Sequence, residues 1–516
     1  ITIDAVDVVG TLVSPDRIEQ GDSRLHYAGS WSVVSSAYSS GGSHRHANSL
    51  GASLTAEFDG QYFAWIATKG SDHGIAKVTL DDSTSKTIPA GQEDNYIVHE
   101  YDLRDVLNVL WASGAEAVSL NDERIVATTS IYCVGSTILV NDTRLSPPYE
   151  FLPVEGESIH QIPVGPVHAG IIEPGHFRFQ CQGETILHLE IQLGYQHRAV
   201  EALLMRSSPT RRLAITETIA GDTSVAHATA YCMVLEALSG VTPPPLADEI
   251  RGIGLELERL ANHVGDLGAL CNDVGYLPGA SWFGRLRGDF LNMSLEICGS
   301  RFGRGLLIPG GVRSYMPGHR REALLRRLQI AETDLCHIAE VTFQSPAVVS
   351  RFEGTGVVSQ ALAETLGLVG VAARASGCDR DVRRDHPFGV FGKLGLQTEK
   401  ASSGGVMARA EIRRRESEAS IQIVRQRVNA LSDGLIRTPL GPSRSHSVAV
   451  ALVEGWRGEV AHMAATDENG QWVLYKIVDP SFHNWPGLAM AMRGGQISDF
   501  PLCNKSFNLS YAGHDL

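Results

Sequence analysis

The chain has 516 residues, of which 43% are hydrophobic and 20% are charged. At roughly 150 residues per domain this length predicts about three domains, and the composition excludes a largely disordered or collagen-like chain. The 44 basic and 58 acidic residues leave a formal net charge of −14, which argues against a general nucleic-acid-binding protein.

Residues 1–88 are rich in Ser, Gly, Thr and aromatic residues, with short alternating apolar runs at 61–68 and 75–80. Alternation with a period of two predicts strands, so we expect a β-sandwich over 1–88. Stretches such as DSRLHYAGSW (22–31) resemble jelly-roll modules of bacterial surface proteins. Four aromatic residues either stack on sugars or fill the core of the sandwich: Tyr27, Trp31, Tyr62 and Trp65.

Residues 89–152 have a different pattern. A helix is predicted over 102–113, and paired strands follow it up to the Pro147-Pro148 pair. We therefore expect a small α+β domain here. The segment DLRDVLNVLWASGAEAVSLNDERIVATTSIYCVGSTILVNDTRLSPPY resembles a domain of unknown function from Gram-positive bacteria.

Residues 153–516 have a longer-ranged, helical pattern. After three consecutive prolines at 243–245, the segment 247–276 carries apolar residues at alternating spacings of three and four, which predicts a long amphipathic helix. Segments 321–341 and 411–431 show the same pattern. We interpret charged residues such as Glu256, Arg259 and Arg326 as solvent-facing or paired between helices. The run Arg413-Arg414-Arg415 is interpreted as a solvent-facing or subunit-facing surface.

Several kinds of site have no signal in the chain. The eight cysteines form no CxxC pair, so we expect reduced thiols and no zinc or iron–sulfur site held by this chain. There is no GxGxxG after a strand, no GxxxxGK[ST] and no GxSxG, so we expect neither NADH nor ATP to bind. No apolar run reaches the length of a bilayer span, so we expect no transmembrane segment.

Seven blocks of the third segment occur in the order typical of one superfamily. The blocks are IPVGPVHAGIIEPGHFRF (162–179), LGYQHRAVE (193–201), ETIAGDTSVAHATAY (217–231), LELERLANH (255–263), IPGGV (308–312), ARASGCDRDVRRDHPF (373–388) and NWPGLAMAMRGGQISD (484–499). Residues 155–516 thereby resemble the large subunits of nickel–iron hydrogenases and the related quinone-site subunit of complex I, the NADH:quinone oxidoreductase. The resemblance is strongest to the membrane-bound, formate-hydrogenlyase-type branch. It implies a large, mainly α domain of hydrogenase large-subunit type, a long helix bundle with peripheral β strands.

The metal-binding cysteines of the hydrogenase members are absent. By the resemblance, two cysteine pairs bind nickel and iron in those proteins, and here Ala220, Thr223, Ser510 and Gly513 stand at the four positions. Alanine and glycine offer no side-chain donor, and neutral hydroxyls are poor ligands for metals that thiolates hold. We therefore expect no nickel–iron centre, no cofactor bound by this chain and no hydrogen activation.

The resemblance then implies the role that the fold has in complex I. We expect a nickel-free subunit of a complex-I-like oxidoreductase, peripheral on the cytoplasmic face of the membrane, with a quinone or related acceptor as substrate. The implied partners are an iron–sulfur small subunit similar to that of complex I and membrane-arm subunits, with no nucleic acid. The alternatives are a non-catalytic scaffold of a hydrogenase-related complex and, for 1–88, a surface carbohydrate binder, since the first two segments resemble exported families.

Four residues are candidates for proton transfer. Complex I places a tyrosine near the position of Gly221, where this chain has none, and His227 is the nearest group able to deliver a proton near neutral pH. His176 lies in a turn similar to the quinone-facing loop of complex I, and Glu173 matches a proton-transferring glutamate of hydrogenases. Asp381 matches a charged position near the family's cavity. Each has a purely structural alternative, namely a hydrogen-bonded core histidine, an ordinary turn or an ion-paired carboxylate.

Four further residues are candidates for substrate binding. His168 lies at the other end of the turn that contains His176. Arg198, Arg374 and Arg383 match charged positions near the superfamily's cavity, and buried arginines require carboxylate partners. We therefore expect an ion-pair network of Arg374 and Arg383 with Asp381, which serves either the cavity or the structure alone.

Overall fold

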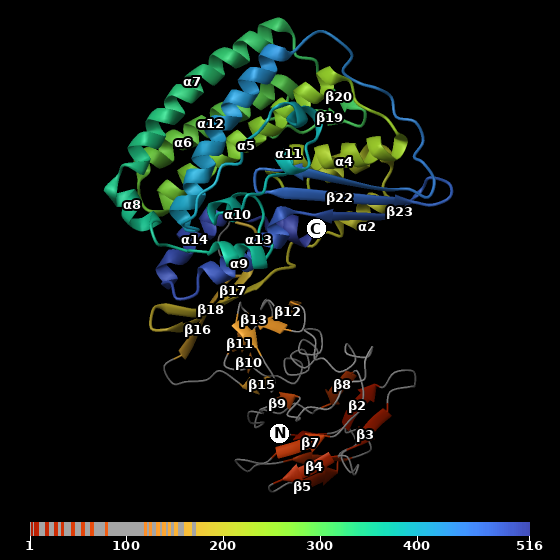
Figure 1. Cartoon of the computed structure of the whole chain (residues 1–516), viewed down its shortest axis with the longest axis vertical. Coiled ribbons are helices and arrows are strands. Elements are labelled where there is room, and N and C mark those ends of the chain that lie inside the picture. Colours follow the sequence, from red (N-terminus) through yellow and green to blue (C-terminus); the bar gives the residue numbers. More distant parts are fainter. Residues whose placement is uncertain are drawn as a thin grey trace. The chain divides into compact units, whose positions relative to one another are not determined.

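The computed structural model describes residues 160–167 and 172–516 with their side chains and, of residues 1–159, the backbone of strands. Two compact units, Ile1–Ile159 and His160–Leu516, divide the chain (Figure 1). The boundary predicted from the change in pattern lies slightly earlier, between residues 152 and 153.

The strands of the first unit form small antiparallel sheets. Their orders are β1-β6-β5, β3-β2-β8, β4-β7, β11-β10-β15-β9 and β12-β13-β14. The strand bounds are β1 Thr2–Ile3, β2 Ala5–Val9, β3 Asp16–Glu19, β4 Leu25–Ala28, β5 Ser32–Ser35, β6 Ser43–His46, β7 Ser53–Ala56, β8 Tyr62–Ile66, β9 Val78–Leu80, β10 Val118–Leu120, β11 Glu123–Ile125, β12 Ile131–Val134, β13 Thr137–Val140, β14 Thr143–Leu145 and β15 Tyr149–Leu152.

Two predictions for this unit lie outside the described residues. They are the helix at 102–113 and the packing of the four aromatic side chains. The described backbone does show that β9 pairs with β15, so a strand before residue 88 shares a sheet with strands of 118–152.

The second unit is mainly helical. Its helices are α2 Val200–Arg206, α3 Pro209–Thr216, α4 Ser224–Ser239, α5 Pro245–Asp273, α6 Leu277–Cys298, α7 Gly318–Phe343, α8 Pro346–Phe352, α9 Gln360–Thr365, α10 Gly370–Ala375, α11 Val382–Asp385, η3 Gly389–Lys393, α12 Val406–Ala430, α13 Pro480–Ala491, η4 Ile497–Asp499, α14 Phe500–Phe507 and α15 Tyr511–Asp515. The three long helices predicted from apolar periodicity are confirmed as α5, α7 and α12. None of the described helices has both the length and the apolar character needed to cross a bilayer.

Three small antiparallel sheets accompany these helices. They are β16 Ile159–Val164, β17 His176–Gln182 and β18 Thr185–Gln192; β19 Leu307–Ile308 and β20 Gly311–Val312; and β21 Val448–Glu454, β22 Glu459–Thr466 and β23 Trp472–Val478. Helix α4 packs on β21 and β22, and α2 packs on β23 (Figure 1). This packing places α4 between the third sheet and α5.

Helix α5 lies at the centre of the unit and packs against α6 and α12 (Figure 1). Its start fits the two prolines at 244 and 245, because proline is favoured at the first helical position, where no N–H partner is lost. Buried aliphatic residues such as Leu257, Leu260 and Val264 join the largest hydrophobic core cluster. Since neighbours cover α5 on several sides, charged residues on it are buried as well.

The solvent-facing interpretation was wrong for part of the charged set. Glu256 and Arg259 have no exposed surface, and Arg413 is 1% exposed. They form pairs with other elements instead: Glu256 with Arg383, Arg259 with Glu416, and Arg413 with Asp266. The interhelical alternative therefore holds for Glu256 and Arg259, because a carboxylate or guanidinium buried at this depth needs a partner. For Arg413, both the solvent-facing and the subunit-facing interpretation were wrong. Arg326 does face solvent.

Candidate functional site

The positions of the absent cysteines meet in space although nearly 300 residues separate them. Arg457, in the turn between β21 and β22, joins the two segments that contain these positions, 220–223 and 508–513. Its two terminal nitrogens donate to the carboxylate of Asp222 at 2.6 and 2.7 Å, and its Nε donates to the carbonyl of Asn508. Asp222 lies between Ala220 and Thr223, and Asn508 lies two residues before Ser510. The Arg457 side chain thus links the two segments at the place where the resemblance locates a metal centre.

The space beside Gly513 is filled by a carboxylate. A Cβ atom added at Gly513 would lie 2.6 Å from the carboxyl carbon of Asp479 and under 3 Å from both of its oxygens. Ser510, at another of the four positions, accepts a hydrogen bond from the Gly513 amide at 2.9 Å and caps α15. In the part of the chain described, no group of three or more His, Cys, Asp or Glu side chains is arranged to hold a metal ion. These residues do not fit a nickel–iron centre.

Solvent reaches part of this site at Asp222. Its side chain is 34% exposed, whereas that of Arg457 is 4% exposed. Burial alone would raise the pKa of Asp222, but the Arg457 guanidinium and its hydrogen bonds outweigh burial and hold the pKa below its usual value. The Arg457 guanidinium also lies 4.0 Å over the ring of Trp456, whose Nε1 donates to the Asp222 carbonyl. These contacts hold the Arg457–Asp222 pair in place and leave one edge of the Asp222 carboxylate open to solvent.

His227 lies beneath this site. It is on the first turn of α4, has no exposed surface, and its Nε2 is 3.1 Å from Oδ2 of Asp479. Its Nδ1 is 3.0 Å from Nε2 of His462 on β22. Both ring nitrogens are thus engaged inside the protein, so His227 reaches the site through Asp479.

Glu173, in the predicted turn that ends at His176, contacts the segment 508–513. Glu173 accepts hydrogen bonds from the amides of Tyr511 at 3.1 Å and Ala512 at 3.4 Å, next to Ser510. His176 begins β17 opposite Gln192, and its buried Nδ1 has no hydrogen-bond partner among the described residues. His168 lies outside the described residues. Glu173 is therefore the member of this turn that the structure places at the site.

Arg198 holds the backbone just before Ala220. Its two terminal nitrogens donate to the carbonyls of Thr218 and Ile219, both at 2.8 Å. The side chain is thus engaged by main-chain oxygens and positions the segment 218–220.

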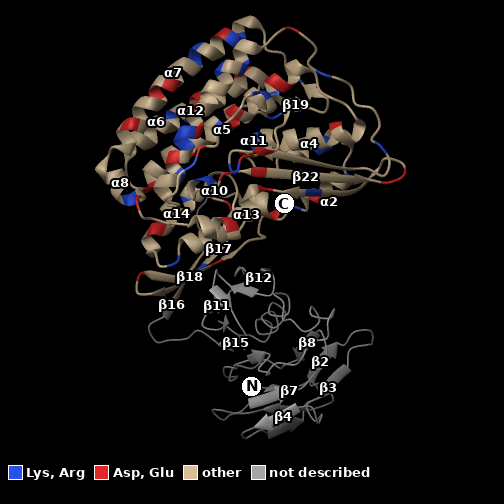
Figure 2. Ribbon diagram, in the orientation of Figure 1, with Lys and Arg blue, Asp and Glu red and all other residues tan. Residues whose placement is uncertain are grey.

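Arg374, Arg383 and Asp381 belong to a separate charged cluster in the core. Arg383 pairs with Asp381 at 2.7 Å and with Glu256 at 3.0 Å. Arg374 donates to Glu416 and Glu454, both at 2.7 Å, rather than to Asp381. Figure 2 shows basic and acidic residues along α12 and around α10 and α11, the elements that supply much of this cluster. The cluster meets the site at the turn after β21, where Arg259 donates to the Glu454 and Gly455 carbonyls.

Sequence reasoning missed Arg457, Asp479, His462 and Tyr475. The pair Asp479-Pro480 does carry a local signal, because aspartate followed by proline is typical of a helix start, and Asp479 caps α13. That signal predicts the cap and not the contact with His227. The other three residues lie on β22, on β23 and in the turn between β21 and β22, and Arg457 and His462 contact partners 235 residues earlier in the chain.

Two family models match the chain. Residues 273–441 match the family described as "Respiratory-chain NADH dehydrogenase, 49 Kd subunit". Residues 68–154 match "Bacterial protein of unknown function (DUF881)".

Curated relatives and a solved structure match about 70% of the chain. The chain is 30% identical over 352 residues to the carbon monoxide-induced hydrogenase of Rhodospirillum rubrum, across 68% of this chain and 98% of that protein. It is 29% identical to formate hydrogenlyase subunit 5 of Escherichia coli, across 71% of this chain and 65% of that protein. It is 27% identical to NADH-quinone oxidoreductase subunit 4 of Thermus thermophilus, across 69% of this chain and 93% of that protein. The fold is similar, with a TM-score of 0.66 and 22% identity, to a chain of the membrane-bound sulfane sulfur reductase, an archaeal respiratory membrane complex, across 70% of this chain and 99% of that one.

Proposed function

Because the chain belongs to the superfamily that unites hydrogenase large subunits with the 49 Kd subunit of respiratory-chain NADH dehydrogenase, it is an oxidoreductase subunit of complex-I-like type, and we propose that it is a nickel-free one that reduces a quinone or related organic acceptor. The electrons come from an iron–sulfur cluster on a partner small subunit. Membrane-arm subunits hold the assembly at the cytoplasmic face of the membrane.

One observation carries this proposal. The four positions at which relatives would hold metal have no thiolate, and Asp479 occupies the space next to Gly513. A site lined by a guanidinium and carboxylates instead suits an acceptor that needs hydrogen bonds and protons during reduction. The open edge of the Arg457–Asp222 pair is where such an acceptor would bind.

A second candidate function is favoured by the packing around His227. Its side chain has no exposed surface and both of its nitrogens are engaged, so the interior behind the site is filled by side chains. A filled interior is what a non-catalytic scaffold needs, since a scaffold only has to hold an iron–sulfur subunit against a membrane module.

The experiment is purification of the intact assembly, followed by metal analysis and assays with soluble quinones and with hydrogen. We expect no stoichiometric nickel, no hydrogen uptake and reduction of a quinone. Asp222→Asn keeps the shape of the side chain but removes the charge paired with Arg457, and we expect it to lower kcat/KM about tenfold, or about 1.4 kcal/mol. The matched control is Asp289→Asn, which neutralises a carboxylate paired with Arg285 on α6.

The outcomes separate the candidates. Nickel-free protein whose quinone reduction falls in Asp222→Asn but not in Asp289→Asn supports the acceptor site. Nickel-free protein that co-purifies with its partners and reduces no acceptor supports the scaffold. One nickel per chain with hydrogen uptake overturns both.

A further inference from the structure

Four buried polar side chains form one continuous hydrogen-bonded line behind the candidate site. The Tyr475 hydroxyl on β23 lies 2.8 Å from Nδ1 of His462 on β22. Nε2 of His462 lies 3.0 Å from Nδ1 of His227 on α4, and Nε2 of His227 lies 3.1 Å from Oδ2 of Asp479. Each of the four residues is at most 2% exposed. A polar chain of this length inside a core requires that every bond be made.

The donors in this line all point the same way. An ionised Asp479 is only an acceptor, so Nε2 of His227 carries the hydrogen. With that single hydrogen on its ring, His227 offers Nδ1 as an acceptor, which places the hydrogen of His462 on Nε2. Nδ1 of His462 in turn accepts from the Tyr475 hydroxyl. The carboxylate at one end thus sets the tautomer of both imidazoles and the direction of the phenol.

The electrostatic setting agrees with these protonation states. Burial raises the pKa of Asp479, but the hydrogen bond from His227 and the Arg457 guanidinium outweigh burial and leave the pKa below its usual value. Burial lowers the pKa of His462 far below its usual value, so His462 is neutral. Burial keeps the pKa of Tyr475 far above 10, so the phenol retains its proton at rest.

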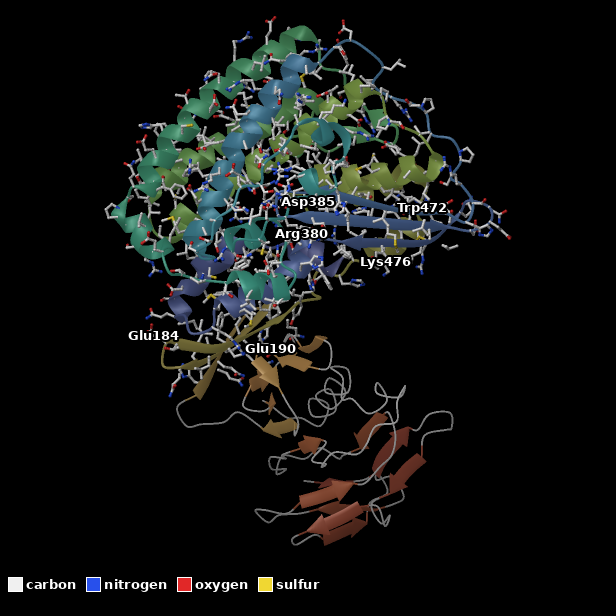
Figure 3. All side chains as sticks on the ribbon, viewed as in Figure 1. Glu184, Glu190, Arg380, Asp385, Trp472 and Lys476 are labelled. Atoms are coloured by element: carbon white, nitrogen blue, oxygen red, sulfur yellow. The ribbon has the colours of Figure 1, made fainter. Side chains whose placement is uncertain are left out.

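The two ends of the line lie in different surroundings. Asp479 lies against Gly513, directly behind the position of the absent cysteine. Tyr475 lies on the edge strand β23 and stacks on partly exposed Trp472, with ring centroids 4.9 Å apart. Figure 3 labels Trp472 and Lys476 on this strand, and Lys476 is more than half exposed. The line therefore runs from an edge of the third sheet to the back of the candidate site.

We propose that Tyr475, His462, His227 and Asp479 form a proton relay that supplies one of the two protons consumed when the acceptor is reduced. This inference rests on the proposed function. It also gives the site the phenolic proton donor that this chain lacks at Gly221, with the donor now two imidazoles away.

One proton moves along the line in three linked transfers. In the first transfer, the Nε2–H bond of His227 breaks as an O–H bond forms on Asp479. In the second, the Nε2–H bond of His462 breaks as Nδ1 of His227 is protonated. In the third, the Tyr475 O–H bond breaks as Nδ1 of His462 is protonated. One proton has then moved from Tyr475 to Asp479, which passes it to the acceptor, while the partner's iron–sulfur cluster supplies two electrons. Solvent protonates the Tyr475 phenolate again, and proton exchange at each imidazole returns its hydrogen from Nδ1 to Nε2.

The chain offers a matched pair of variants. Tyr475→Phe removes the outer hydroxyl and keeps the ring. Tyr231→Phe removes the hydroxyl of another buried tyrosine, whose ring centroid is 6.3 Å from that of Tyr475 and which is not part of the line. We expect Tyr475→Phe in the intact assembly to lower kcat at least tenfold, to leave KM for the quinone unchanged and to change the solvent deuterium isotope effect. Tyr231→Phe should change none of these.

A second variant and a second readout complete the test. Should Tyr475→Phe fail to fold, His462→Asn breaks the line in its middle and should lower kcat in the same way. Independently of turnover, the ¹⁵N spectrum of histidine-labelled full-length chain should show both imidazoles protonated on Nε2. A His462 protonated on Nδ1 would reverse the direction of donation and overturn the relay.

The failures are distinguishable. A wild-type assembly that reduces no acceptor defeats the proposed function and the relay with it. An assembly that reduces quinone at the same rate in Tyr475→Phe and Tyr231→Phe defeats the relay alone, and the line is then only a structural link between α4 and the third sheet.

Discussion

Arg374 shows what holds a charge in the interior of this protein. It has no exposed surface, yet its guanidinium donates to two carboxylates and to the carbonyl of Arg380. Removal of a guanidinium from such a place leaves carboxylates buried without their main counter-charge, which costs far more than loss of a pair at the surface. The charge of Arg374 is therefore a condition of folding as well as a feature near the site.

Replacement of Arg374 by methionine tests this at the residue scale. We expect Arg374→Met to lower the free energy of unfolding by about 3–5 kcal/mol, because Glu416 and Glu454 lose their shared partner. The control is Arg414→Met on α12, since Arg414 also donates to two glutamates but is 26% exposed. The control should change the free energy of unfolding by at most about 1 kcal/mol. Equal losses in urea unfolding would show that burial does not set the cost.

Residue types predicted this cluster in part. The need of a buried arginine for a carboxylate led to the expected network of Arg374, Arg383 and Asp381, and Arg383 does pair with Asp381. The principal partners of Arg374 come from α12 and β21, 42 and 80 residues along the chain. Charge type thus predicts that a partner exists, but only the tertiary packing determines which one.

At the scale of elements, apolar periodicity predicted three of the four described helices that exceed 20 residues, but it did not predict α6, and it predicted the short helices poorly. The helices α5, α7 and α12 each carry the 3.6-residue pattern over several turns. Helix α4 is buried on nearly all of its faces, so its sequence SVAHATAYCMVLEALS has no polar stripe from which periodicity could be measured. Its residue His227 was predicted from a family block, and the strands that supply His462 and Tyr475 were not predicted.

Helix α10 is positioned by a close backbone contact. Gly370, its first residue, has a φ of +63°, and a Cβ atom there would lie 2.0 Å from the carbonyl oxygen of Arg457. The neighbouring Gly367 has a φ of +66° but open space around it. The two glycines therefore share the same backbone conformation and differ in packing.

This pair separates backbone strain from packing at the element scale. We expect Gly367→Ala to cost about 1 kcal/mol, from the left-handed conformation alone. Gly370→Ala should cost at least about 2 kcal/mol more, because the methyl group overlaps a backbone carbonyl that cannot move without shifting Arg457. Denaturant unfolding of both variants measures the difference. Similar losses would mean that the turn carrying Arg457 yields easily, and that the Arg457–Asp222 pair is less rigid than its contacts indicate.

At the scale of the whole molecule, the site exists because two ends of the helical unit meet. Segment 220–223 precedes α4 and segment 508–513 follows α14. Arg457, in the turn between β21 and β22, joins the two segments. The resemblance to hydrogenase large subunits predicted which positions face one another, through the places of the absent cysteines. It did not predict what fills the space, because it singled out neither Asp479 nor Arg457.

The free energy of unfolding of the helical unit should depend on pH in part through His263. His263 is fully buried on α5, 2.8 Å from Glu416, and burial lowers the pKa of its imidazole to about 4. Its unfolded pKa is about 6.5. Between these values the unfolded chain binds the extra proton, so stability that is fully present above pH 6.5 is lost as pH falls towards 4.

Two carboxyl groups oppose this trend in the same range. Burial raises the pKa of Glu258 to about 8 and that of Asp248 to about 6. For these groups the folded chain binds the proton more tightly, so their contribution grows as pH falls. The wild-type profile alone therefore mixes both signs, and a comparison between variants is needed to isolate His263.

We expect His263→Asn to remove the acid-side loss that the imidazole causes. The free energy of unfolding of wild type, relative to the variant, should fall by up to about 3 kcal/mol between pH 7 and pH 4. The reason is that the pKa of the imidazole differs by about 2.5 between the unfolded and folded chain, and each pKa unit corresponds to about 1.4 kcal/mol. Urea unfolding at a series of pH values measures this difference, and His319→Asn, at an exposed position on α7, is the control whose difference should stay flat. A parallel pair of wild-type and His263→Asn profiles would mean that the folded state admits the proton at His263, and that the charged core around Glu416 is more hydrated than its burial indicates.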